Sequence, residues 1–206
     1  MPTKNAVKDY KEHGIYHIYN RGVNKETFLF SEEDFEIVLM LLQRYLIENA
    51  GNKLSTRQVR NYSNEINLFA FCILENHYHF LLSQRSISGM SNFMRSLNIS
   101  ITYYLNKRRG RTGHLLQGVY KARLIKDDFD FIHTSKYIHL NPDPHDPEYS
   151  VNYKYSSAPG YVSRGSQSNW DFVEECHILK FFGNKKSDYK DYLLSGSDPY
   201  GSDPLD

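Results

Sequence analysis

The feature that most constrains the fold is a nearly continuous apolar run at residues 66–74, INLFAFCIL, followed at once by ENHYHFLL at 75–82. Short apolar runs of this kind, rich in aromatic and branched residues, predict strands rather than helices. Asn76 stands near the expected turn between the two runs. We therefore expect a pair of strands here, with the first of them central in a sheet.

The second run contains two histidines, His77 and His79, one residue apart. Alternate residues of a strand point the same way, so the two side chains should project from one face about 6.5–7 Å apart at the backbone. Imidazoles at that spacing can converge on one metal ion. The alternative is a pair of histidines hydrogen-bonded beneath a helix, and the short His-x-His pattern leaves both interpretations open.

Alternation, helical spacing and capping residues define the other elements. In chain order we expect a strand at 14–22, a helix from Ser31 to Gly51, strands at 66–74 and 75–82, a helix at 90–109, a strand at 113–126, and a helix from Asp127 or Asp128 to about Leu140. The order β-α-β-β-α-β-α resembles a ferredoxin-like antiparallel sheet with helices packed on it, which is an α+β fold.

The domain organisation is expected to change near residue 165. Residues 1–165 should form one compact domain, because the predicted elements of the sheet all lie there. Residues 166–206 should form a C-terminal extension with a short helix at 171–183 and a flexible tail that repeats GSDP. The two cysteines, Cys72 and Cys176, lie far apart and show no metal-ligand spacing.

Three separated motifs occur in the order ENHYHFLL, YLNKRRGRTGHLLQGVYKARLI and YIHLNP. In this order and spacing they resemble the single-tyrosine HUH nuclease family, and within it the insertion-sequence transposases and the REP-associated tyrosine transposases. The resemblance runs from about Tyr16 to Tyr161. It implies an HUH endonuclease-like ferredoxin core, cleavage of single-stranded DNA with strand transfer through a covalent 5′-phosphotyrosine intermediate, and a role in DNA transposition.

The resemblance also implies the site residues. His77 and His79 match the paired metal ligands, Tyr137 matches the nucleophile, and Asn141 matches the third metal ligand, a place that the insertion-sequence branch fills with Gln. Tyr137 and Asn141 are four residues apart on the predicted helix, so they face the same way. Oxygen ligands favour Mg²⁺, whereas imidazoles shift the preference toward Mn²⁺ and heavier ions, so we expect Mg²⁺ or Mn²⁺ and leave other ions open. The alternatives are that Tyr137 is a core aromatic residue and that Asn141 only caps the helix.

A basic segment follows the second predicted helix and is interleaved with tyrosines. Cations that neutralise phosphates, beside aromatic rings that stack on bases, are typical of a groove for single-stranded nucleic acid. The predicted DNA contacts are Lys107, Arg108, Arg109, Arg111, Tyr120, Lys121 and Arg123, with Arg21 added by the resemblance. A charge run of this kind can also be a solvated helix end.

The formal net charge is only +1, so attraction to nucleic acid must come from such a local patch. The first residues are polar and no run approaches membrane-spanning length, which favours a cytoplasmic protein without a membrane partner. The resemblance implies single-stranded DNA with a hairpin as the partner, and it leaves a homodimer open. The alternative function is a catalytically inactive regulator that binds hairpin DNA with the same fold.

Overall fold

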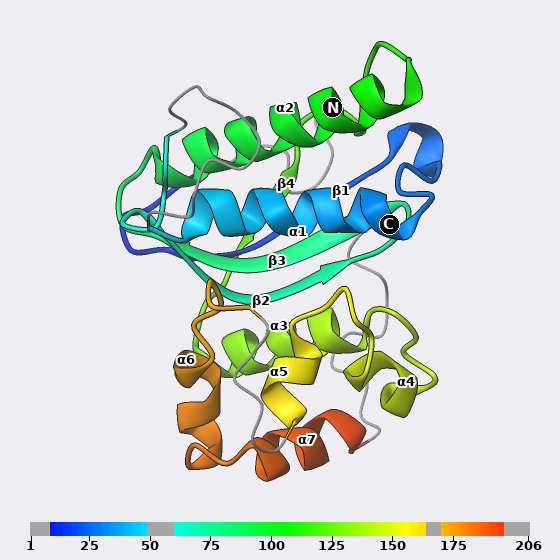
Figure 1. The fold of residues 1–206 in the computed structure, drawn as a ribbon. Helices are drawn as coiled ribbons and strands as arrows, with labels where there is room; N and C mark the ends of the chain where they lie inside the picture. The colour runs from blue at the N-terminus through cyan, green and yellow to red at the C-terminus, as the bar shows by residue number, and fades with distance from the viewer. Residues whose placement is uncertain (1–8, 49–59, 164–169, 196–206) are drawn as a thin grey trace.

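The computed structural model describes residues 9–48, 60–163 and 170–195, and in them it contains a four-stranded sheet. The strands lie in the order β2-β3-β1-β4, and all neighbours are antiparallel (Figure 1). The strands are β1 (Ile15–Arg21), β2 (Ile66–Ile73), β3 (His77–Gln84) and β4 (Lys121–Leu124). This order arises from two interleaved β-α-β units, which confirms the predicted ferredoxin-like α+β fold.

The pleat of the central strands divides the protein into two cores. Along β3, Tyr78 and Phe80 belong to one cluster of buried side chains, whereas Leu81 belongs to the other. Successive side chains of a strand point to opposite faces, so His79 shares the face of Leu81. The sheet is therefore covered on both sides, and its histidines lie on the side away from the first two helices.

The first face is covered by α1 (Glu32–Leu46) and α2 (Gly89–Arg109), which lie side by side over the sheet (Figure 1). The predicted apolar positions of α2 are all buried: Met90, Phe93, Met94, Leu97, Ile101 and Leu105. The helix ends at Gly110, whose left-handed conformation (φ 59°) suits a residue without a Cβ atom. The predicted second helix is confirmed at both ends.

The second face is covered by α3 (Asp128–Leu140), and the shorter helices pack outside it (Figure 1). The Asp127 side chain caps α3 by accepting a hydrogen bond from the Asp130 amide at 2.8 Å. The remaining helices are η1 (Val23–Lys25), α4 (Pro147–Val151), α5 (Ala158–Val162), α6 (Cys176–Leu179), η2 (Lys180–Phe182) and α7 (Lys186–Leu194). No helix in the described ranges is both long and apolar enough to cross a membrane.

Polar bonds join α3 to α7 on the side away from the sheet. The Lys136 ammonium group, 1% exposed, donates a hydrogen bond to the Tyr192 carbonyl oxygen at 2.7 Å. The Tyr189 hydroxyl donates to Ser135 Oγ at 3.0 Å and lies 2.8 Å from His139 Nδ1. Because buried polar groups are costly when unpaired, these bonds fix the position of α3 against the C-terminal helix.

Several predictions are wrong. The strand expected to be central, β2, lies at an edge of the sheet, and its apolar residues are buried because isolated bridges to Val173 and Ser156 cover that edge. The strand expected at 113–126 shortens to β4, because positive φ angles at Gly113 and Gly118 turn the chain before it pairs. The helix expected at 171–183 starts only at α6, since Val173 bridges to Leu68 of β2 instead. Helices α4 and α5 form where a loop was expected, and α7 was not predicted. The helix expected to close at Gly51 ends at Leu46, because the backbone of Ile47 is extended (φ −106°, ψ 127°). The GSDP tail lies outside the described residues.

Replacing a buried aromatic residue of the first face should destabilise the fold strongly. We expect Phe80→Ala to lower the free energy of unfolding by about 3–5 kcal/mol, because Phe80 is fully buried and the change leaves a cavity. Ile99→Ala on the outer face of α2, 63% exposed, is the control and should change it by less than about 0.5 kcal/mol. Urea unfolding measures both, and equal losses would contradict the assigned core.

Candidate active site

The two histidines of β3 face the same side of the sheet, beneath α3. In the strand register, His79 lies opposite Tyr19 of β1. The centres of the His77 and His79 rings are 5.1 Å apart. Tyr78 between them points into the first core, where its hydroxyl donates a hydrogen bond to Asn98 Oδ1 at 2.8 Å. The alternation expected from the sequence is therefore present in the structure.

Helix α3 places Tyr137 beside this pair. The centre of the half-buried Tyr137 ring lies 5.4 Å from that of His79 and 5.6 Å from that of His17 in β1. Both ring pairs meet edge to face, at interplanar angles of 79° and 67°. A phenol from the helix and imidazoles from two strands thus meet at one point. The role of Tyr137 as a nucleophile stays a prediction.

Asn141 ends α3 one turn after Tyr137 and reaches the same point. Its Oδ1 atom lies 2.9 Å from His77 Nε2, while His77 Nδ1 lies 2.6 Å from Asn76 Oδ1. With bonds of about 2.1 Å, adjacent ligands of an octahedral Mg²⁺ or Mn²⁺ ion are about 3 Å apart. The separation of the His77 and Asn141 donor atoms therefore fits two neighbouring ligands of one such ion.

The outward nitrogen of the second histidine supports the same fit. His79 is fully buried, and its Nε2 atom has no hydrogen-bond partner among the described residues. Burial, with the nearby imidazoles of His17 and His77, holds the pKa of His79 well below its ordinary value. The ring is therefore neutral, and a neutral imidazole can offer a lone pair to a metal ion. An unpaired buried nitrogen is costly unless something binds it.

His17 is a residue of this site that the sequence analysis missed. Its Nε2 atom lies 2.8 Å from His79 Nδ1, and the side chain is 1% exposed. Burial and the neighbouring Arg123 guanidinium group lower the pKa of His17 to about 3. The alternation of GIYHIYNRG predicted only a strand. The contact of His17 with His79 could be predicted only if the pairing of β1 with β3 were known.

Arg123 of β4 fastens α3 to the sheet beside His17. Its guanidinium group donates hydrogen bonds to both carboxylate oxygens of Asp130, at 2.8 and 2.9 Å, and to Thr134 Oγ1 at 2.7 Å. Both carboxylate oxygens accept from Nη1 while Nη2 donates to Thr134, so bonds from the two terminal nitrogens together fix the direction of the side chain as well as its distance. Arg123, a predicted DNA contact, thus has a structural partner on the helix that carries Tyr137.

The other predicted DNA contacts lie on β1, on β4, at the end of α2 and in the segment between α2 and β4. Next to the histidines, Arg21 Nε donates to Gln117 Oε1 at 2.7 Å, and Lys121 Nζ lies 5.6 Å from the centre of the Tyr19 ring. The Tyr120 ring is buried, and its hydroxyl lies 2.6 Å from that of Tyr10. The structure therefore places the two cations, but not this tyrosine, at the accessible edge of the site.

The basic residues at the end of α2 are partly engaged within the protein. Arg108 forms ion pairs with Glu33 and Asp34 of α1, at 3.2 and 3.4 Å. Arg109 also pairs with Asp34 and donates to the Phe28 carbonyl oxygen at 2.7 Å. The other two members of this group, Lys107 and Arg111, are both exposed. Lys107 Nζ lies 5.9 Å from the centre of the Tyr103 ring.

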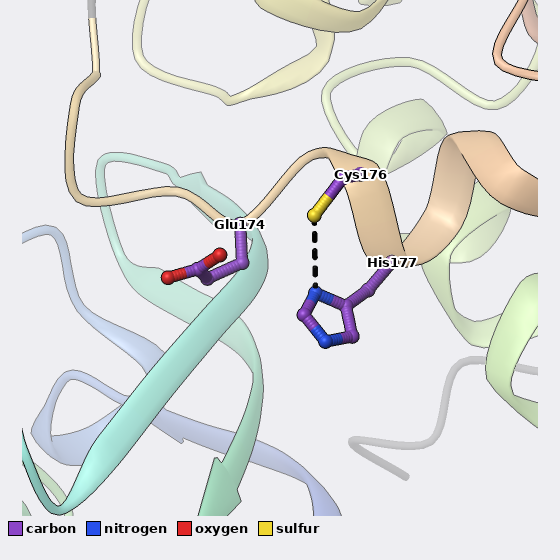
Figure 2. A group of neighbouring side chains, drawn as sticks. All are labelled: Glu174, Cys176 and His177. Carbon is purple, nitrogen blue, oxygen red and sulfur yellow. Dashed lines mark hydrogen bonds between the residues drawn. The ribbon is translucent and has the colours of Figure 1, made fainter.

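A different group of possible metal ligands lies at the start of α6. Figure 2 shows Cys176 and His177 facing each other, with Glu174 on the preceding loop. Cys176 Sγ and His177 Nδ1 are 3.5 Å apart, and the ligand atoms of all three exposed residues lie within 4.8 Å of one another. The Glu174 amide bonds to the Leu68 carbonyl oxygen near the start of β2. His77 starts β3, which is antiparallel, so this group lies toward the other end of the sheet.

Comparisons with known proteins bear on the fold and on the family that the chain resembles. Residues 57–141 match the family model "Transposase IS200 like", and the matched segment contains the paired histidines, Tyr137 and Asn141. Over this segment, which is less than half of the chain, the sequence is similar to this family of transposases. A solved structure described as a REP-associated tyrosine transposase bound to a REP hairpin shares the fold, with 13% identity, a TM-score of 0.54, and coverage of 84% of this chain and 98% of that one. No curated protein matches the chain.

Loss of the ion pair between Arg123 of β4 and Asp130 of α3 should lower the free energy of unfolding. We expect Asp130→Ala to lower the free energy of unfolding by about 1–3 kcal/mol, because it leaves the half-buried Arg123 without its carboxylate. Asp128→Ala is the matched control, since it removes the same charge from the exposed first turn of the same helix. Chemical unfolding of both variants gives the difference. Equal effects would show that the Arg123 pair does not hold the helix.

Proposed function

We propose that this protein cleaves single-stranded DNA beside a hairpin and holds the cut strand as a 5′-phosphotyrosine on Tyr137. The observation that supports this proposal most directly is the meeting of the Tyr137 ring with the two buried or half-buried histidines of β3. The match of residues 57–141 to the IS200-like transposase family supports DNA strand chemistry.

In the proposed reaction the Tyr137 phenolic oxygen forms a bond to the scissile phosphorus, in line with the bond that breaks. The bond from phosphorus to the 3′-oxygen of the preceding nucleotide breaks, and that oxygen takes up a proton to become a free 3′-hydroxyl group. The phenolic proton is released to water. Another 3′-hydroxyl, which loses its proton, then attacks the same phosphorus; the bond from phosphorus to the Tyr137 oxygen breaks, and the phenol takes up a proton. This rejoins the strands without a nucleotide cofactor, because the covalent link retains the bond energy.

The metal ligands in this proposal are His77 Nε2, His79 Nε2 and Asn141 Oδ1, with Mg²⁺ or Mn²⁺ as the ion. Such an ion, when bound, supplies positive charge that polarises the scissile phosphate and offsets its negative charge. All three ligands are neutral, so they leave the ion's charge available for the phosphate. The chain's own contribution is to keep the donor atoms of His77 and Asn141 at ligand spacing and to keep the His79 nitrogen unpaired.

For the DNA we propose a local path over the cations at the edge of the site. Arg21 lies on β1, next to the strand of the two histidines, and Lys121 lies on β4, the strand beyond β1. Lys107 and Arg111 extend the positive charge along α2 and its end. Three further arginines would contact phosphates through N–H groups that are not used in their ion pairs within the protein: Arg108, Arg109 and Arg123. The buried Tyr120 would stabilise the segment that precedes β4. The similar solved structure carries a REP hairpin, which makes a hairpin the substrate to test first.

The proposal also includes the domain organisation, the location and the oligomeric state. Residues 1–165 would carry the cleavage chemistry, and residues 166–206 would act as an extension of it. A cytoplasmic location and a possible homodimer also stay predictions. The alternative function, a hairpin-binding regulator without catalysis, differs from the proposal in one measurable respect, since it forms no covalent product.

Removal of the Tyr137 hydroxyl should abolish the covalent product. We expect wild-type protein with a hairpin oligonucleotide and Mn²⁺ to give a protein–DNA adduct on a denaturing gel, and Tyr137→Phe to give none, because phenylalanine lacks the attacking oxygen. Tyr103→Phe, on the exposed side of α2, is the matched control and should keep the adduct. An adduct that persists in Tyr137→Phe would refute the assignment of the nucleophile.

Removal of the metal should separate cleavage from binding. We expect EDTA, or His77→Ala with Mn²⁺ present, to abolish the adduct while the affinity for the hairpin falls by less than about tenfold, because basic side chains provide most of that affinity. Gel-shift titrations at fixed salt measure the affinity. If wild-type protein binds the hairpin equally well with and without EDTA and never forms an adduct, the regulator is the correct alternative.

A further inference from the structure

We propose that His17 is a positioning residue that fixes the tautomer and ring orientation of the metal ligand His79. This inference rests on the proposed function, because it concerns the metal site named there. It assigns a role to a third imidazole, one contributed by β1 rather than by the His-x-His motif. The contact between His17 Nε2 and His79 Nδ1, at 2.8 Å, carries the inference.

The two rings meet in the geometry of a nitrogen-to-nitrogen hydrogen bond. Their planes differ by 25°, and their centres are 5.1 Å apart while the two nitrogens are 2.8 Å apart. The rings therefore meet edge to edge and nearly in one plane, as a ring N–H and a ring lone pair require. Neither side chain is more than 1% exposed, so water does not compete for this bond.

The number of ring hydrogens determines which histidine donates this hydrogen bond. A neutral imidazole carries one N–H and one lone pair, so only one of the two facing nitrogens can hold the shared hydrogen. If His17 donated it, His79 would carry its own hydrogen on Nε2, where it has no acceptor among the described residues and where a hydrogen excludes a metal ion. If His79 donates from Nδ1, its Nε2 lone pair is free to bind the ion.

The surroundings of His17 favour its role as an acceptor. Arg123 lies opposite His17 in the β1–β4 register, and its guanidinium group engages the nearby Asp130 carboxylate. Metal-bound histidines usually donate their second N–H to a carboxylate, a backbone carbonyl or water. A neutral imidazole in that place orients His79 without adding negative charge, so the ion keeps its full charge for a DNA phosphate.

The test compares Mn²⁺ affinity in the absence of DNA. We expect His17→Phe, which keeps a flat ring without an acceptor, to weaken Mn²⁺ binding by about 10–100-fold in titrations followed by electron paramagnetic resonance. His17→Gln should restore most of the affinity, because its side-chain oxygen can accept from His79 Nδ1. All proteins in the series carry Cys176→Ser, so that the exposed group at the start of α6 does not compete for the ion.

A second measurement does not depend on how well the variants fold. Long-range ¹H–¹⁵N correlation spectra of metal-free protein report which ring nitrogen of each histidine carries hydrogen. We expect hydrogen on His79 Nδ1 with His17 present. Thermal unfolding of His17→Phe without metal shows whether the fold is retained, and if it is not, the spectra of the protein with His17 intact decide.

The outcomes distinguish the two proposals. Mn²⁺ binding that is absent, or that survives His77→Ala, would remove the metal site and with it both proposals. Binding that requires His77 but is equally tight in His17→Phe would overturn only the role of His17. Hydrogen found on His79 Nε2 in metal-free protein would overturn it as well. Weaker binding in His17→Phe, rescue by His17→Gln and hydrogen on Nδ1 together support it.

Discussion

The alternation of side chains along β3 is the constraint on which the rest of the structure depends. It sends Tyr78 and Phe80 into the core beneath α1 and α2, and it leaves His77 and His79 together on the face beneath α3. The apolar residues that fold the sheet and the imidazoles of the candidate site are thus interleaved in one strand. A shift of one residue in the pairing of β3 would bury the histidines among apolar side chains and empty the site.

Helix α3 is held from both sides, which gives Tyr137 a defined place above the histidines. Toward the sheet, Arg123 donates to both carboxylate oxygens of Asp130, and on the outer side Lys136 bonds to α7. Both attachments use buried or half-buried polar groups, whose bonds are stronger away from water and whose loss is costly. Helix α7 thus supports the position of the phenol, although it contributes none of the side chains His77, His79, Tyr137 and Asn141.

The fold class and the shared face of the two histidines could be predicted from the sequence because they follow from local rules, whereas the meeting of Tyr137 with them was expected only from the family resemblance. Strand alternation placed His77 and His79 on one face, and helical periodicity placed Tyr137 and Asn141 on another element with a common direction. The contact of His17 with His79 depends instead on which strands pair and in what register, which no local pattern encodes. The loop before β4 and the short helices α4, α5 and α7 were missed for a related reason. Positive φ angles at Gly113 and Gly118 end the expected strand, and the three short helices are stabilised mainly by packing against their neighbours.

The central claim is that the Tyr137 phenol is the group that reacts at the histidine pair. The most direct measurement is to trap wild-type protein with a hairpin oligonucleotide and Mn²⁺, digest both components, and locate the retained nucleotide by mass spectrometry. The account predicts one modified peptide, with a 5′-linked nucleotide on Tyr137. A nucleotide on any other tyrosine, or none in protein that binds the hairpin and Mn²⁺, would contradict it.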